Sequence, residues 1–445
     1  MKRIDIAAAA LLLAAAPGTV ETLDALIERE LAGVQAVYKT LHAAPELSHH
    51  EEMTSALLAR ELSAAGFTVT QHVGKFDKPG WSGFGVVAVM KNGDGPTVLV
   101  RSDMDALPVE EKTGLPYASV VRTKTDTGQE VGVMHACGHD IHMATLIGTA
   151  RTLSAIKDRW RGTLMLIGQP AEETVDGAKA MLADGLYERF GKPDFAVALH
   201  DKDDLEAGKV SYCPGFALAS GTSVDIIVRG VGGHGSRPEV TKDPIVVASQ
   251  IVLALQTIVS RETSPLDPAV VTVGSIHGGS KRNIIPDDVT LQLTVRTYKD
   301  EVRKKILSSI ERISRGTAQA AGVPEDRLPI VKVIENEGTP ATFNDPALTE
   351  RLARALEKAL GEDNVVKRDP VMGSEDFGWF ALEGRKIPAV MLTLGAVEPA
   401  KVEASRRTGT PLPSLHSSLF APLPEPTLRT GVKAMTTAIL ELMKK

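Results

Sequence analysis

The 445-residue sequence has little of what membrane, nucleic-acid-binding and disulfide-rich proteins require. Its two cysteines, Cys137 and Cys213, are too few for a disulfide framework. Its lysines and arginines form no extended run and the formal net charge is -6, so we expect no nucleic acid partner. Its N-terminal apolar stretch, Ile6 to Ala16, is far shorter than the roughly 20 residues of a membrane span, so we expect no membrane partner. The aromatic content of 4% gives little support for a large aromatic pocket.

The first 20 residues have the layout of a secretory signal peptide. Lys2 and Arg3 precede the apolar stretch, and small residues follow it. The early Asp5, the alanine-rich composition and Pro17 near the expected cleavage point instead favour an extension of the first helix. We expect residues 1–20 to be a signal peptide and the protein to be periplasmic or secreted. The alternative is a cytoplasmic protein with an N-terminal extension.

The rest of the sequence has the composition of a globular protein, with strand patterns alternating with helical ones. Apolar residues make up 43% of the chain and charged residues 24%, and the length suits two or three domains. Helical patterns from about Leu23 to Ala44 and over 51–66 precede apolar strand patterns that alternate with helices. This alternation predicts an α/β fold with a central mixed sheet flanked by helices.

Between about Ser220 and Glu337 the order of the patterns changes. Strand, helix, strand, strand, helix and strand follow one another, which is the β-α-β-β-α-β order of a ferredoxin-like unit. Patterns of the first kind then resume towards the C-terminus. We therefore predict one domain formed by residues 21–219 and 338–445. Residues 220–337 are inserted into it as an α+β domain.

One short segment, MHACGHDIHMA at residues 134–144, concentrates metal-binding residue types. It holds one of the two cysteines and three of the eleven histidines. Cys137 and His139 flank a glycine between an apolar run and a helical pattern, so their donor atoms can face one point in space. Zinc takes thiolate, imidazole and carboxylate ligands, and a catalytic site keeps one coordination position open. The segment therefore predicts a metal site.

Acidic and imidazole residues follow several of the predicted strands. Asp103, the pair Glu172–Glu173, and His200 each come just after an apolar run. In open α/β sheets, sites form beyond the carboxyl ends of the strands, so we expect these side chains at one edge of the sheet. The candidate metal ligands are Cys137, His139, Glu173, His200 and His416. Five donors suit two divalent cations that share a ligand and a water; zinc is our expectation, with manganese or cobalt as alternatives.

Two pairs of acidic residues have candidate catalytic roles. Glu172 and Glu173 are adjacent, so their side chains diverge, and one can bind a metal while the other takes a proton from the metal-bound water. Spacing alone does not say which does which. Asp103 and Asp105 are two residues apart and share one face of a strand, where one of them is expected to orient a ligand by hydrogen bonding.

The ordered motifs resemble those of a known enzyme family. They are RSDMDALP, MHACGHDIHMA, GQPAEE, ALH, GVGGHGSRP, NIIPD, MGSEDF and HSSLF, and they cover the chain from about Leu41 to Phe420. In this order they resemble the dinuclear zinc amidohydrolases and metallopeptidases of the aminoacylase–carboxypeptidase type. The branch is that of hippurate hydrolase, N-acetyldiaminopimelate deacetylase and the auxin–amino-acid conjugate hydrolases. The resemblance implies that residues 21–219 and 338–445 form a zinc-exopeptidase-like catalytic, metal-binding domain and that residues 220–337 form a lid and dimerisation domain. It also implies metal-dependent hydrolysis of the amide bond of N-acyl amino acids or small peptide-like conjugates, and a homodimer.

The resemblance also implies roles for individual residues. The five candidate ligands match the metal ligands of the family, and Glu172 matches its general base. Asp103 matches the acidic residue that acts with this base, and Asp105 is the alternative for that role. His234 is expected to reach across a dimer interface to the scissile carbonyl. Asn283 and Arg296 are expected to contact the substrate, one of them holding a carboxylate.

Some residues depart from the family pattern, and other functions stay open. The strand-end histidine is followed by DKDD instead of an apolar or aromatic residue. Many members of the family have a second histidine after GGHAAxP, where this chain has GGHGSRPE. Both changes put the acyl and amine specificity in doubt. A metal-dependent dipeptidase or carboxypeptidase is the alternative enzyme. A catalytically silent metal- or ligand-binding protein is the alternative of another class, and the presence of Glu172 speaks against it.

Overall fold

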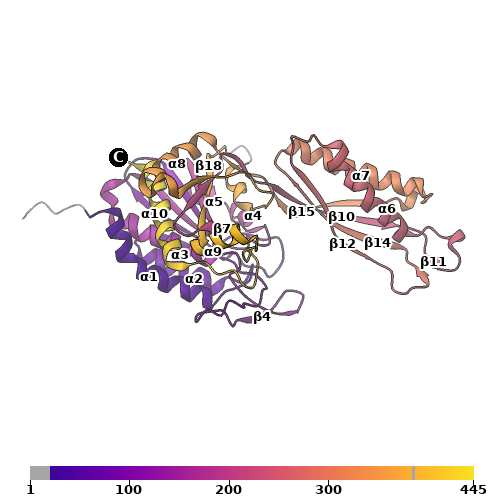
Figure 1. Cartoon of the computed structure of the whole chain (residues 1–445), viewed down its shortest axis with the longest axis horizontal. Coiled ribbons are helices and arrows are strands. Elements are labelled where there is room, and N and C mark those ends of the chain that lie inside the picture. Colours follow the sequence, from indigo (N-terminus) through magenta and orange to yellow (C-terminus); the bar gives the residue numbers. More distant parts are fainter. Residues whose placement is uncertain (1–20, 383–385) are drawn as a thin grey trace, which may run out of the picture.

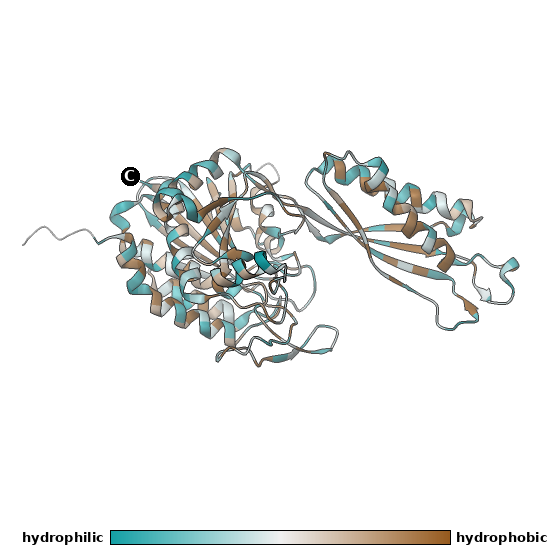
Figure 2. Cartoon of the chain, viewed as in Figure 1, coloured by the Kyte–Doolittle hydropathy of each residue, from teal (hydrophilic) through white to brown (hydrophobic). Residues whose placement is uncertain are grey.

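The computed structural model describes residues 21–382 and 386–445, and the expected signal peptide at residues 1–20 lies outside them. The described chain forms two lobes that lie one after the other along the longest axis, joined by a narrow connection near the start of β10 and the end of β15 (Figure 1). Apolar residues run along the strands of both lobes (Figure 2). Each lobe has buried apolar clusters of its own.

The larger lobe is built on an eight-stranded mixed sheet with the strand order β1-β2-β6-β3-β7-β18-β8-β17. Neighbours in the central part, β6, β3, β7 and β18, run parallel, whereas β2 is antiparallel to β6 and β8 to β18. The strands are β1 (Thr68–Val73), β2 (Gly85–Asn92), β3 (Thr97–Asp103), β6 (Gly162–Gln169), β7 (Phe195–Glu206), β8 (Val210–Tyr212), β17 (Val365–Lys367) and β18 (Ala389–Val397). This confirms the predicted α/β class with a mixed central sheet.

Helices cover the sheet of the larger lobe. They are α1 (Leu23–Ala43), α2 (Glu52–Ala64), α3 (His139–Ala155), α4 (Gly177–Ala183), α5 (Leu186–Phe190), α8 (Pro346–Leu360), α9 (Pro399–Thr408) and α10 (Pro424–Met443). The first predicted helix is confirmed: the side chain of Thr22 caps α1 by accepting from Ala25 N at 3.2 Å. Leu31, Val34 and Tyr38 lie on one helical stripe, which is buried in the core.

The smaller lobe is a four-stranded antiparallel sheet with the order β12-β14-β10-β15. Its elements follow the predicted β-α-β-β-α-β order: β10 (Ser220–Arg229), α6 (Pro244–Thr257), β12 (Ala269–Gly278), β14 (Asp288–Thr297), α7 (Asp300–Ala320) and β15 (Ile330–Thr339). Both helices contribute to one buried cluster with the strands. A short ribbon of β11 (Gly233–His234) and β13 (Ile284–Ile285) lies at the end of this lobe that points away from the larger one (Figure 1).

Several short strands were not expected from the sequence. They are β4 (Arg122–Lys124) with β5 (Glu130–Gly132), and β9 (Gly215–Leu218) with β16 (Thr342–Asn344). The prediction that the strand containing His200 ends there was wrong, because β7 continues to Glu206. Parallel pairing with β18, in which Thr393 lies opposite His200, continues past that residue and keeps the polar run DKDD extended.

Candidate metal centre and active site

Five segments that are distant in sequence deliver the candidate residues to one edge of the large sheet. Asp103 is the last residue of β3, which lies between β6 and β7. Glu172 and Glu173 follow β6, and His200 lies within β7. Cys137 and His139 stand at the start of α3, and His416 lies in the segment before α10. The parallel direction of β3, β6 and β7 places their carboxyl-terminal parts at the same edge.

The five predicted ligands converge on a small volume. Cys137 Sγ lies 3.3 Å from His416 Nε2 and 3.6 Å from His200 Nε2. Glu173 Oε1 lies 3.6 Å from His416 Nε2 and 3.9 Å from His139 Nε2. The donor atoms of Cys137, His139 and Glu173 all lie within 4.8 Å of one another. One thiol, three imidazoles and one carboxylate therefore surround a common centre.

The unused hydrogen-bonding capacity at this centre fits metal binding. His139 Nδ1 is 2.8 Å from the carbonyl oxygen of Asp105, and His200 Nδ1 is 2.7 Å from that of Asp201. The second nitrogen of each ring is thus held by the backbone, which leaves Nε2 facing the centre. His139 Nε2 and Glu173 Oε1 are buried without a hydrogen-bond partner among the described residues. Buried donors of these types match the ligand preferences of zinc and similar divalent cations.

A glycine makes the approach of Cys137 and His139 feasible. Gly138 precedes α3 with φ 75°, in the left-handed region. A Cβ at this position would lie 2.0 Å from Oδ2 of Asp201, so no side chain fits between the turn and β7. The sequence C-G-H therefore forms a tight turn that presents its thiol and its imidazole from the two sides of the glycine.

The adjacent glutamates occupy different surroundings. Glu173 Oε1 belongs to the group of donors around Cys137, whereas Glu172 groups with Glu375 and Asp376. Glu172 Oε2 still lies 3.8 Å from His139 Nε2, at the border of the ligand set. Burial raises the pKa of Glu172 well above its ordinary range, and the nearby Glu375 carboxylate adds to the effect. Glu172 is therefore a proton-accepting group beside the donors, not among them.

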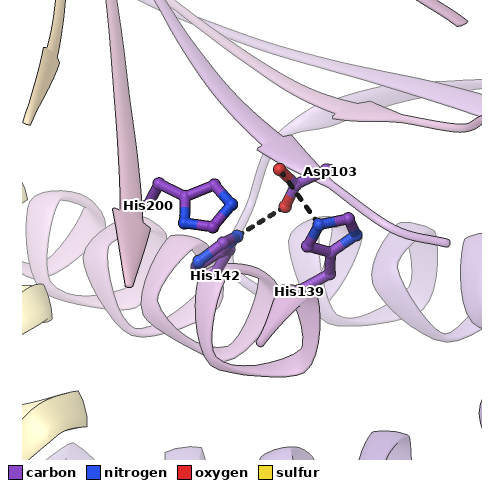
Figure 3. Close-up of side chains that lie close together, drawn as sticks. All are labelled: Asp103, His139, His142 and His200. Carbon is purple, nitrogen blue, oxygen red and sulfur yellow. Dashed lines mark hydrogen bonds and ion pairs between the residues drawn. The ribbon is translucent and has the colours of Figure 1, made fainter. Parts of the chain in front are cut away.

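A buried charge network lies behind the ligands. Asp103 Oδ1 is 2.6 Å from Nδ1 of His142, and Oδ2 is 2.5 Å from the guanidinium of Arg101. Figure 3 shows Asp103 between His139 and His142, which come from one turn of α3, with His200 on the neighbouring strand. Arg101 also contacts Glu375 at 2.8 Å. Burial alone would raise the pKa of Asp103, but Arg101 and His139 hold it well below its usual range.

Asp105 has contacts that differ from those of Asp103. Its Oδ2 accepts hydrogen bonds from Ser48 Oγ at 2.6 Å and from the backbone nitrogen of Glu173 at 2.9 Å. Its Oδ1 lies 3.3 Å from His139 Nδ1. Asp105 thus contacts two candidate ligands at once, whereas Asp103 is bound to Arg101 and His142. Of the two residues that the sequence left open, Asp105 has the contacts of an orienting group.

The electrostatics of the centre favour positive charge. Burial by itself would lower the pKa of His139, but Asp103 and Asp105 raise it to about 10. Burial raises the pKa of Glu173 to about 7, and it raises the pKa of the Cys137 thiol well above its usual range, with Glu173 adding to it. The protein alone thus retains protons here, and cations that bind would displace them because metal ligands are deprotonated.

Two adjoining cavities open beside the centre, between the lobes. The larger has a volume of about 1170 Å³ and is lined by Cys137, Glu172 and His416 among others; the smaller has about 380 Å³. Glu173 and Arg296 line both. Arg296 is half-buried, and it bonds the hydroxyls of Thr294 and Ser374 without an acidic partner among the described residues. Its guanidinium is therefore placed to receive an anionic group within the cleft.

The other two predicted substrate residues lie elsewhere. His234 belongs to β11 and Asn283 precedes β13, at the far end of the smaller lobe (Figure 1). They are neighbours, since Gly235 N donates to Asn283 O at 2.9 Å, and both are exposed. Neither lines the two cavities. Within one chain, the structure does not bring these residues to the metal centre.

Sequence reasoning missed two buried charged groups of the site. Arg101 lies in the apolar run of β3, and a charge in such a run was the available signal. Asp201 was noted only as a departure from a family pattern. Two further histidines lie nearby: His142 lies between Asp103 and the backbone of Asp201, and both ring nitrogens of His135 are buried without a partner among the described residues.

Comparison with known proteins places this arrangement in a family. The sequence pattern of peptidase family M20/M25/M40 matches residues 99–407. Hippurate hydrolase of Campylobacter jejuni is 38% identical over 342 residues, which are 76% of this chain and 82% of that protein. N-acetyl-L-cysteine deacetylase of Bacillus subtilis is 36% identical over 355 residues, 80% of this chain and 78% of that protein.

Solved structures agree with this family assignment. A putative aminohydrolase from methicillin-resistant Staphylococcus aureus superimposes with a TM-score of 0.80 at 32% identity, covering 95% of this chain and 99% of that one. A dinuclear metal-binding peptidase of the M20 family from Bacillus subtilis superimposes with a TM-score of 0.72 at 28% identity, covering 94% and 99%.

Proposed function

The chain belongs to peptidase family M20/M25/M40 and is a hydrolase of amide bonds, and on this premise we propose that it releases the acyl group from N-acyl amino acids or small amino-acid conjugates. One observation carries the proposal. Donors from four distant segments converge, two of them with buried atoms that have no partner among the described residues, next to a buried carboxylate, Glu172, that stands outside the donor group. A protein that only stored or bound a metal would not need this extra carboxylate beside its ligands.

We assign the metal centre to Cys137, His139, Glu173, His200 and His416, holding two divalent cations, with zinc as the first candidate and manganese or cobalt as alternatives. The close approach of the thiol to two imidazoles supports this set. When bound, such cations supply an activated water and polarise the scissile carbonyl. Every ligand assigned here is a testable prediction.

The residues of the chain supply the proton transfers and the orientation. Glu172 takes a proton on its carboxylate from the attacking water and returns it to the leaving nitrogen. Its burial and its distance of 3.8 Å from His139 Nε2 put it beside the centre. Asp105 fixes the ring of His139 and the backbone of Glu173. Asp103 holds His142 and Arg101, and so supports the same helix and strand from behind.

Arg296 is our candidate for binding the carboxylate of the amino-acid part. It faces both cavities from β14 of the smaller lobe, whereas the metal ligands come from the larger lobe. A substrate that reaches from the ligands to Arg296 would therefore connect the lobes and favour their closure over the site. The larger cavity, with its wall residues Leu218, Val371 and Met391, suits an apolar acyl group.

We further propose that the active unit is a homodimer formed through the smaller lobe. The stretch Pro244–Glu262 is long and apolar enough to cross a membrane, yet it packs on the four-stranded sheet. Only 33% of the most apolar part of this stretch is buried. Exposed apolar side chains lie along α6 and at its end, namely Ile245, Val246, Leu253 and Val259. Beside it, β12 is an edge strand of the sheet. A second copy would cover this face and bring its own His234 towards the site.

Mixing two inactive variants tests the shared site. In a homodimer whose site combines Glu172 of one subunit with His234 of the other, a mixed dimer of Glu172→Gln and His234→Ala has one intact site. Random reassembly should then restore about a quarter of wild-type activity, because half of the dimers are mixed and each has one of two sites. Mixtures with no more activity than the separate variants would contradict the proposal.

A substrate panel tests the reaction itself. N-acyl amino acids that differ in the acyl group should be cleaved in the presence of divalent cations and not after chelation. Unblocked dipeptides serve as the competing class, because a thermostable carboxypeptidase of Saccharolobus solfataricus is 34% identical over 92% of this chain and 95% of its own length. Turnover of dipeptides alone would replace the proposed substrate class.

For the segment that precedes the described residues, we propose export with cleavage near residue 20. The support is the order of charged, apolar and small residues at the N-terminus. Mass spectrometry of the mature protein from a periplasmic fraction would show the new N-terminus, and an intact Met1 in the cytoplasmic fraction would contradict export.

A further inference from the structure

Asp201 is a buried carboxylate whose own oxygens have no hydrogen-bond partner among the described residues. Its side chain is 0% exposed, and neither Oδ1 nor Oδ2 is bonded within the part of the chain that the structure describes. Buried carboxylates are normally paired or hydrogen-bonded, because removing the charge from water is unfavourable. Asp201 therefore requires a source of compensation.

The surroundings of Asp201 are the back of the proposed metal centre. Its Oδ1 lies 3.3 Å from Nε2 of His142 and 3.4 Å from Nδ1 of His200. Its Oδ2 is packed against Gly138, the turn residue between Cys137 and His139. The carboxylate thus touches the two segments that deliver three of the assigned ligands.

Neither imidazole offers Asp201 a full ion pair. The backbone nitrogen of Asp201 donates to His142 Nε2 at 2.8 Å, so that nitrogen carries a lone pair and the proton is on Nδ1, towards Asp103. His200 Nδ1 donates a hydrogen bond to the carbonyl oxygen of Asp201 at 2.7 Å and lies farther, at 3.4 Å, from the carboxylate oxygen Oδ1. No other cationic side chain of the described residues lies within ion-pair distance of Asp201, so cations held by His200 and Cys137 would supply the missing positive charge.

The other acidic residues behind the centre are already compensated. Asp103 is paired with Arg101, and Asp105 accepts from Ser48 and from the backbone of Glu173. Among the acidic residues that the structure describes, Asp201 alone combines burial, contact with an assigned ligand and two unbonded oxygens. A carboxylate behind a metal-binding imidazole strengthens that ligand and fixes its proton on the far nitrogen.

We propose that Asp201 is a positioning residue of the metal centre, a buried negative charge that orients His200 and increases the affinity of the site for divalent cations. This inference rests on the proposed function, since it assumes that the centre holds cations. It gives the unusual sequence after the strand-end histidine a role at the metal centre, in addition to any effect on the substrate.

The test compares Asp201→Asn and Asp201→Val with wild type and with Asp94→Asn. Asp94 is an exposed residue of the turn before β3, at the opposite end of that strand from Asp103, and its variant removes the same charge. Zinc affinity is measured by competition with a chromogenic chelator on purified full-length protein. Both Asp201 variants should bind zinc about 10–100-fold more weakly than wild type, and Asp94→Asn should match wild type.

Melting temperatures separate a metal-directed charge from simple packing. Without metal, the Asp201 variants should melt at a higher temperature than wild type, because the uncompensated buried charge is gone. With saturating zinc, the gain in melting temperature should be smaller for the variants than for wild type.

The possible outcomes are distinct. Zinc affinity equal to that of wild type in both Asp201 variants would overturn the inference. So would a lower melting temperature of both variants in the metal-free and loaded states at unchanged affinity, which is the signature of packing alone. If wild type binds no divalent cation, the proposed function fails first and this inference with it.

Discussion

Replacing Glu172 with glutamine separates metal binding from catalysis. Glutamine keeps the volume of the side chain and removes its ability to take a proton. The donor atoms around Cys137 belong to Glu173 and the histidines, and Glu172 is not among the atoms that group with that thiol. We therefore expect the variant to contain as much metal as wild type, measured by elemental analysis.

The same variant should lose most of its turnover. A positioned general base contributes roughly 10²–10⁴-fold, which corresponds to about 2.7–5.4 kcal/mol of barrier at 1.36 kcal/mol per tenfold. The value of kcat for an N-acyl amino acid should fall by that factor with KM little changed, because Glu172 acts on the water and not on the bound acyl group.

Glu173→Gln is the matched control, since it makes the same chemical change one residue further on. Glu173 Oε1 is 3.6 Å from His416 Nε2, within the donor group, so this variant should lose metal as well as activity. If Glu172→Gln lost metal and Glu173→Gln kept it, the two assignments would have to be exchanged. Near-normal turnover of Glu172→Gln would refute the base altogether.

Three more predictions concern other parts of the molecule. Cys137→Ala should lower the metal content of the purified protein, and an unchanged ratio of metal to protein would remove the thiol from the ligand set. Arg296→Met should reduce kcat/KM about 10–150-fold for substrates with a free carboxylate, which corresponds to the loss of one hydrogen bond between charged groups. The kcat/KM for the corresponding amides should stay unchanged. His42 lies between Asp140 at 2.7 Å and Glu111 at 3.1 Å; burial opposes its charge, but these carboxylates raise its pKa to about 10. Because the pKa of His42 in the folded protein exceeds its ordinary value of 6.5, its contribution to stability is complete below pH 6.5 and is lost as the pH rises towards 10. Between pH 7 and 9 the melting temperature of wild type should therefore fall more steeply with pH than that of His42→Gln.

Most of the fold was predictable because its signals are local. The helical stripe of α1 and the apolar runs of β3, β6 and β18 are periodic in the sequence, and their order implied the mixed sheet and the ferredoxin-like arrangement. The end of β7 was not predictable, because the polar residues after His200 are extended only through pairing with β18. Short pairs such as β4 and β5 carry no long apolar pattern.

The candidate ligands could be proposed from the sequence, because metal chemistry demands a few residue types and strand ends deliver them to one edge, where the structure brings them together. The surroundings of those ligands could not be predicted in this way. The sequence did not indicate that Arg101 pairs with Asp103. It also left open which of Asp103 and Asp105 has the orienting role, since the two were expected on one face of a strand and differ only in their neighbours.

By itself, the sequence determined which residues are of a type that can bind cations or take protons, and the order of strands and helices, because residue type and periodicity are properties of the chain. Only the tertiary structure decided which lone pairs remain unused, that Arg296 faces the cleft while His234 lies at the far end of its lobe, and that Asp201 is sealed behind His200. Distance and burial arise from the packing of segments that are far apart in sequence, and they decide how an ionisable group behaves.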